Sequence, residues 1–119
     1  MDTIVAATGL TEREAQKRVY DVVTAFVEAN TKPRYMGGGA RIPLKVVADS
    51  ATGRLLGAQA VGDETAFWRI NIVATLLEKR ATIWDLFTLD LGYMPKTNVV
   101  WDPLTIAARI LLRKTSKRN

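Results

Sequence analysis

Residues 42–61 read IPLKVVADSATGRLLGAQAV, two β-type runs joined by a turn. In the first run, Ile42–Ala48, apolar residues alternate with polar ones, as in a strand that buries one face. The turn Asp49–Gly53 ends in a glycine that can adopt a positive φ, and Leu55–Val61 forms the return strand. The sequence therefore predicts an antiparallel hairpin.

Two further strands and one helix are predicted before the hairpin. The short apolar run Ile4–Ala7 indicates an edge strand, and the β-branched and aromatic run Val22–Val27 indicates a second strand. Between them, Thr11 and Glu14 have the spacing of a capping box, in which each side chain binds the backbone amide of the other residue. A helix should therefore begin at this point and run to about Val19.

Three helices are predicted after the hairpin. In Glu64–Arg80 the apolar residues repeat with a helical period around most of the circumference, which indicates a largely buried helix. The Thr-x-x-acid pattern of Thr82–Asp85 predicts a short helix to about Phe87. Asp102-Pro103 has the form of an N-cap followed by proline at the first helical position, so a last helix should run to about Leu112. This order of elements predicts an α+β domain with an antiparallel sheet of three to five strands and helices packed on one face.

The composition excludes several kinds of chemistry. The chain has 119 residues, enough for one folded domain, and contains neither cysteine nor histidine. Disulfides, thiol redox centres and thiolate or imidazole metal sites are therefore ruled out within it. Among the acids Asp85, Asp90 and Asp102, the first and last stand at predicted helix starts, where capping explains them. We expect no metal site, no cofactor bound by this chain alone and no catalysis by it in isolation.

The net charge of +5 is concentrated at the C-terminal end. We expect a domain over residues 1–112 and a solvated basic tail over residues 113–119, which supplies four of these charges. The tail has no aromatic residue to stack on bases, so a nucleic-acid adaptor is only a third alternative. No apolar run has the length of a membrane span, and Met1-Asp2-Thr3 does not begin a signal peptide. We expect a cytoplasmic protein that binds neither nucleic acid nor membrane.

Several segments in a fixed order carry a family resemblance over about Val5–Leu112. They are Gly9–Ala15, Tyr35–Gly38, Leu44–Gly62, Arg69–Ala74, Leu89–Pro95 and Trp101–Pro103. Together they resemble the dimerisation domain of the pyridine nucleotide–disulfide oxidoreductase family, in the branch of CoA-disulfide reductases and NADH oxidases. Members of that family use FAD and NAD(P)H, but this chain has no Gly-x-Gly-x-x-Gly motif to bind either cofactor. The resemblance implies a dimerisation domain without the FAD and NAD domains.

The resemblance also implies positions for site residues. Tyr35 and Tyr93 could face the active site of a partner, where a hydroxyl could donate a hydrogen bond or a proton. The alternative, favoured because the chain has no flavin domain, is that both are interface tyrosines with solvated hydroxyls. The chain departs from the family at Met36 and Lys96, where relatives have proline, and at Thr97, where they have an aromatic residue. The predicted interface residues are Tyr93, Met94, Pro95, Trp101, Asp102 and Pro103.

The sequence thus predicts a stand-alone dimerisation or interaction domain that forms a homodimer. The alternative is a detached subunit or fragment of a split flavoprotein disulfide reductase, which would complete the active site of a partner carrying FAD and NAD. The helices predicted at residues 64–80 and 104–112 carry apolar residues on more than one face. Because a small sheet covers only one side of each helix, the remaining apolar surface favours pairing.

Overall fold

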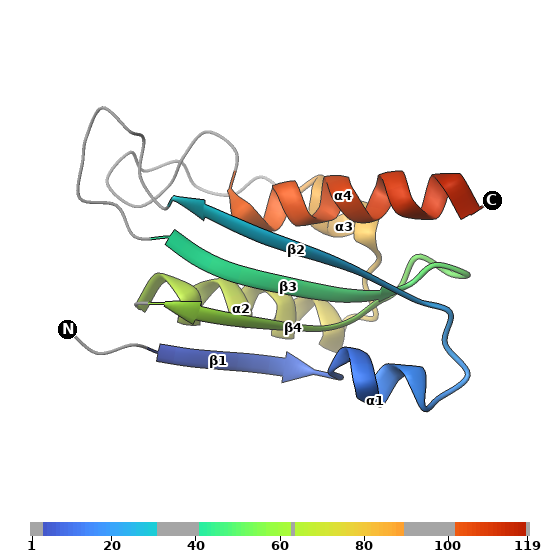
Figure 1. Cartoon of the computed structure of the whole chain (residues 1–119), viewed down its shortest axis with the longest axis horizontal. Coiled ribbons are helices and arrows are strands. Elements are labelled where there is room, and N and C mark those ends of the chain that lie inside the picture. The colour runs from blue at the N-terminus through green and yellow to red at the C-terminus, as the bar shows by residue number, and fades with distance from the viewer. Residues whose placement is uncertain (1–3, 31–40, 63, 90–101, 119) are drawn as a thin grey trace.

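The computed structural model describes residues 4–30, 41–62, 64–89 and 102–118 of the chain (Figure 1). The elements follow the predicted order of one strand, one helix, three strands and three helices. All four strands form one antiparallel sheet in the order β1-β4-β3-β2, so the N-terminal strand lies at an edge, as predicted. The strands are β1 (Ile4–Gly9), β2 (Val22–Asn30), β3 (Arg41–Asp49) and β4 (Leu55–Gly62).

The predicted hairpin is the pair β3–β4. Leu44 pairs with Ala60, and Val46 pairs with Ala58, with an irregularity between Val47 and Ala48. Gly53 ends the turn with φ +78°, the left-handed conformation that glycine adopts at little cost. The alternation read from the sequence is therefore confirmed, and it directs Leu44, Val46, Ala58 and Ala60 into the core.

Two long helices cover one face of the sheet, as Figure 1 shows. Helix α2 (Glu64–Glu78) packs on β1 and β4, and helix α4 (Pro103–Arg118) packs on β2 and β3. The short helix α3 (Ile83–Phe87) packs against α4. The hydrophobic core lies between this helical layer and the sheet. No helix in the described ranges has the length and apolar character needed to cross a membrane.

The short helix α1 (Glu12–Gln16) is the exception, because it packs on the opposite side of the sheet. Its Ala15 is fully buried with Val47 and Leu56. The predicted capping box is present: Thr11 N donates to Glu14 Oε1 (2.9 Å) and Glu14 N donates to Thr11 Oγ1 (3.1 Å). The helix ends before the predicted Val19, whose side chain is fully exposed and so offers no packing to extend it.

Helix α2 ends in a Schellman motif that was not predicted from the sequence. Ala81 N donates to Leu76 O (3.0 Å) and Arg80 N donates to Leu77 O (3.0 Å). Arg80 occupies the left-handed position of this motif, with φ +54°, where glycine is the usual residue. It is the one non-glycine residue with positive φ in the described part of the chain.

Helix α4 is longer than predicted and takes in most of the predicted basic tail. The helix continues through Arg118, past the predicted end at Leu112. Lys114 Nζ donates to the carbonyl oxygen of Thr24 (2.7 Å), which ties this part of the helix to β2. The basic residues therefore extend a helix along the sheet.

Candidate interface

Most of the predicted site residues lie outside the described part of the chain. This applies to Tyr35, Tyr93, Met94, Pro95 and Trp101. Their roles at an interface or beside a partner's active site stay predictions.

The other two predicted interface residues, Asp102 and Pro103, lie in the described part, and both side chains are buried within their own chain. Asp102 is 5% exposed and Pro103 less than 2%. With so little accessible surface, they cannot contribute much contact area to a partner. They instead fix the start of α4, the element that follows residues 90–101 in the chain.

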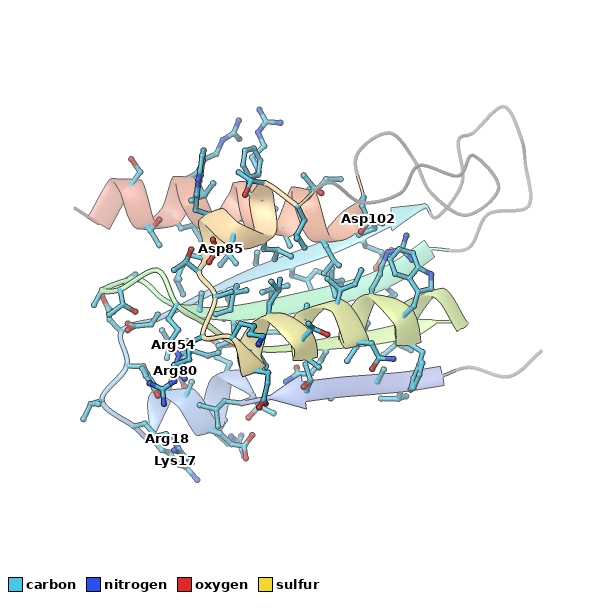
Figure 2. All side chains as sticks on the ribbon, turned by 180° about the vertical axis from the view of Figure 1, so that it is seen from behind. Lys17, Arg18, Arg54, Arg80, Asp85 and Asp102 are labelled. Atoms are coloured by element: carbon cyan, nitrogen blue, oxygen red, sulfur yellow. The ribbon has the colours of Figure 1, made fainter. Side chains whose placement is uncertain are left out.

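The buried carboxylate of Asp102 has two tasks. It accepts the backbone N–H of Leu104 (2.9 Å), which confirms the predicted N-cap. It also accepts hydrogen bonds from the fully buried Arg69 guanidinium: Nε lies 3.1 Å and Nη2 2.8 Å from Oδ2. Figure 2 shows Asp102 at the start of α4. The pair therefore joins α2 to α4 through a charge-assisted contact inside the fold.

Sequence reasoning missed Arg69 as a buried residue. Arginine is rarely buried without a partner, and this one lies 33 positions from its acid, a separation that local patterns do not detect. Its burial could have been inferred from its position on the helix, because it shares the buried side of α2 with Ala66, Ile70 and Val73. The guanidinium also lies over the Trp68 ring, 4.1 Å from its centroid.

The outer surface of α2 carries the strongest sign of an interface. Phe67 is 55% exposed, and Asn71 and Thr75 follow it at helical spacing on the exposed side. From Ala66 to Leu77 the sole charged residue is Arg69, which is buried, so this stretch presents no exposed charge. Depletion of charge around an exposed aromatic residue characterises the centre of protein interfaces.

Helix α3 adds a second exposed aromatic residue to the helical layer. Trp84 is 58% exposed and lies 5.7 Å, between ring centroids, from Phe87. The leftover apolar surface predicted on the helix at residues 64–80 is thus present on α2, and α3 adds an exposed aromatic residue that was not predicted. The leftover surface predicted on the last helix is not found, because α4 has no large exposed hydrophobic residue within the described residues.

The open face of the sheet is a further apolar surface, and it was not predicted from the sequence. Val5, Phe26 and Val61 are all exposed on it, and Phe26 is 62% exposed. With their neighbours they line a shallow depression of about 230 Å³. Lys45 lies in this face, where Glu12 of α1 binds its Nζ at 2.5 Å. The alternation along each strand indicates these residues, because side chains next to core residues in a strand point to the opposite face of the sheet.

Two of the described acids, Asp85 and Glu14, cap helices. No group of three or more metal-ligating side chains occurs in the residues that the structure describes. Asp85 accepts from Thr82 N (2.8 Å) and so caps α3, as predicted. The backbone N–H of Thr11, and then its hydroxyl, hold the pKa of the Glu14 carboxyl below its ordinary value. None of these contacts forms a catalytic arrangement.

Comparison with known proteins gives a consistent family. Residues 1–103 match the family described as "Pyridine nucleotide-disulphide oxidoreductase, dimerisation domain". The chain is 51% identical over 111 residues to an NAD(P)H sulfur oxidoreductase (CoA-dependent) of Pyrococcus furiosus, covering 93% of this chain and 25% of that protein. It is 49% identical over 111 residues to an NAD(P)H coenzyme A polysulfide/persulfide reductase of Pyrococcus horikoshii, with the same coverage of each chain.

A solved structure gives the same picture. The NAD-dependent persulfide reductase of A. fulgidus superposes with a TM-score of 0.90 and 28% identity, over 98% of this chain and 22% of that one. The chain therefore spans about a quarter of the length of the relatives that it matches.

Proposed function

The chain belongs to the pyridine nucleotide-disulphide oxidoreductase dimerisation domain family, and from this we propose that it joins two copies of itself into a homodimer and has no catalytic activity in isolation. The observation that carries the proposal is the outer face of α2, which exposes Phe67 and no charge between Ala66 and Leu77. A single exposed aromatic residue is ordinary in a monomer, but a charge-free helix face around it favours burial against a partner.

Two-fold symmetry favours α2 for this contact. In a two-fold dimer the same patch of each subunit meets its copy, so the patch must complement itself. A helix that crosses the symmetry axis meets that demand, because its side chains can interdigitate with those of its copy. Phe67 would lie near the centre of such a contact, with Asn71 and Thr75 as polar neighbours.

The open sheet face supports a second kind of contact. The relatives are about four times longer than this chain, and a domain within such a protein must contact both its own remaining part and the partner subunit. The two apolar surfaces lie on opposite layers of the fold, one on α2 and one on the sheet face with Phe26. We assign the α2 surface to the homodimer and the sheet surface to a flavoprotein moiety.

Two phenylalanines of similar exposure allow a matched test. Phe67→Ser removes the aromatic ring from α2, and Phe26→Ser removes one from the sheet face. We expect light scattering at micromolar concentration to give a dimer mass for the unchanged chain and for Phe26→Ser, but a monomer mass for Phe67→Ser. A monomeric unchanged chain would refute homodimerisation. Dissociation by Phe26→Ser alone would move the contact to the sheet.

A second candidate is a component of a split oxidoreductase. The length of the relatives favours it, because this chain matches only about a quarter of each relative, and both relatives are named as NAD(P)H enzymes. In this case a cytoplasmic partner would carry FAD and NAD(P)H, and Tyr35 and Tyr93 would reach its active site. We expect the purified chain to be colourless, without NADH oxidation. Recovery of activity on mixing with a flavoprotein that lacks this domain, and its loss with Phe26→Ser, would support the candidate.

A further inference from the structure

A group of four basic side chains gathers at the end of the molecule that holds the β3–β4 turn. We propose that Lys17, Arg18, Arg54 and Arg80, here named the basic corner, form a binding site for a diphosphate group. The site is independent of the proposed dimer contact on α2.

Three separate segments build the basic corner. Arg54 begins the approach to β4, and Arg80 follows α2; Leu55 N donates to Ala81 O (3.0 Å) and Ile83 N to Gly53 O (2.8 Å), so these segments run side by side. Helix α1, which ends before Lys17 and Arg18, packs against Leu56 of β4. Figure 2 shows Arg54 and Arg80 next to each other, with Arg18 and Lys17 on the adjoining segment. The tertiary fold therefore gathers charges that are far apart in the sequence.

Arg54 shows an incomplete hydrogen-bond arrangement. Its Nε is buried and has no hydrogen-bond partner, the one such side-chain atom among the described residues. A buried donor without an acceptor costs stability, and a native protein usually supplies that acceptor as water or ligand. Because this Nε has no accessible surface, an anion would bind the terminal nitrogens of the partly exposed Arg54 guanidinium and not the Nε itself.

Arg80 is retained where the backbone favours glycine. Its φ of +54° is a conformation that L side chains seldom adopt, and it occupies the Schellman position described above. Fold stability alone would favour glycine at this position. A guanidinium kept despite an unfavourable backbone conformation is explained if the guanidinium binds something.

Most acids near the basic corner are engaged elsewhere: Asp49 accepts from Asp21 N (3.1 Å), Ala51 N (3.2 Å) and Thr52 Oγ1 (2.9 Å). Glu78, two residues before Arg80, is exposed and offsets one of the four positive charges. Glu14 accepts from Thr11 at the start of α1, although Lys17 and Arg18 also act on it electrostatically. Asp85 accepts from Thr82 at the start of α3. The described structure gives no salt bridge to Arg54 or Arg80. The corner thus keeps an excess of positive charge that an anionic ligand can neutralise.

The guanidinium groups of the basic corner favour a phosphate-type anion. Three of the four side chains, Arg18, Arg54 and Arg80, end in a guanidinium group, and a guanidinium fork matches two oxygen atoms of a phosphate group. Because the four cations lie on three segments, one ligand can reach several of them only if its oxygen atoms are distributed over more than one phosphorus atom. A diphosphate has this form, either as the inorganic ion or as part of a nucleotide.

Titration of the full chain at constant ionic strength tests the proposal. Sodium diphosphate, ADP and adenosine are added separately, and binding is followed by calorimetry and by amide NMR shifts. We expect saturable binding of diphosphate with a Kd below about 1 mM. ADP should bind at least as well, and adenosine should not bind. Equal affinities would identify the diphosphate as sufficient, and tighter binding of ADP would add a nucleotide contact beside it.

Three variants locate the site. Arg54→Gln and Arg80→Gly should each weaken diphosphate binding by about tenfold or more, since each removes charge-assisted hydrogen bonds. Arg113→Gln removes one charge from the exposed side of α4 and should change affinity by less than about twofold. Glycine suits the backbone at position 80, so Arg80→Gly should stay folded. Absence of saturable binding, binding of adenosine alone, or an equal loss in Arg113→Gln would overturn the proposal.

Discussion

Replacing Asp102 by alanine tests the buried contact that joins α2 to α4. The change removes the carboxylate from a fully buried Arg69 and removes the cap of α4. Breaking one side of a buried ion pair costs about 3–5 kcal/mol, because the remaining charge stays desolvated. Loss of an N-cap costs about 1 kcal/mol more. The free energy of unfolding should fall by about 4–6 kcal/mol, a large part of the 5–15 kcal/mol that a typical domain has.

Urea denaturation at neutral pH, followed by circular dichroism and tryptophan fluorescence, measures this loss. Asp85→Ala is a suitable control, since Asp85 also stands at a helix start but is exposed, and it should cost no more than about 1 kcal/mol. The double variant Arg69→Met/Asp102→Asn should be more stable than Asp102→Ala, because it leaves no buried charge and keeps an oxygen for Leu104 N. A loss below about 1 kcal/mol for Asp102→Ala would refute the reasoning.

Three other predictions concern the backbone and the first helix. Gly57→Ala should destabilise the fold far more than Gly53→Ala in thermal melts, because a Cβ at Gly57 would lie 2.0 Å from a backbone oxygen, whereas a Cβ at Gly53 has no atom within 4 Å and adds only the strain of a left-handed φ of +78°. Arg80→Gly should raise stability by about 1 kcal/mol, while Arg80→Ala should not, since only glycine relieves the left-handed backbone; equal melting temperatures would contradict this. The pKa of Glu14 is lowered in the folded chain, so its stabilising contribution is present above the ordinary carboxylate pKa and is lost as pH falls through the lowered value. NMR titration should show that Thr11→Ala raises this pKa.

Local patterns in the sequence predicted the parts of the fold that depend on neighbouring residues. Both capping boxes are present at the predicted residues, because their hydrogen bonds join positions three apart. The hairpin alternation also needed no distant information. The predicted C-terminal ends of α1 and α4 were wrong because tertiary contacts determine where these helices end. Val19 has nothing to pack against, so α1 ends before it, whereas Lys114 of α4 binds a carbonyl 90 positions away.

The candidate site was harder to predict than the fold. The buried Arg69–Asp102 pair and the basic corner depend on which segments meet, and charge patterns in one sequence do not report such meetings. The open sheet face follows from two facts together, namely the alternation of each strand and the gathering of both long helices on one side. Only the first fact can be read directly from residues. The surface with Phe67 was predicted because the helix itself has apolar residues around its circumference.

The position of β1 has a consequence for the order of folding. Strands β2, β3 and β4 are consecutive neighbours, whereas β1 pairs with β4 across about half of the sequence, with Ile4 opposite Gly62. Closing so long a loop costs entropy, so we expect the β2–β3–β4 meander to form early and β1 to dock late. Amide exchange should then be faster in β1 than in β3. Until β1 docks, the edge of β4 is open to the first strand of another molecule, and exchange of β1 between two chains is the misfolded dimer to expect during refolding at high concentration.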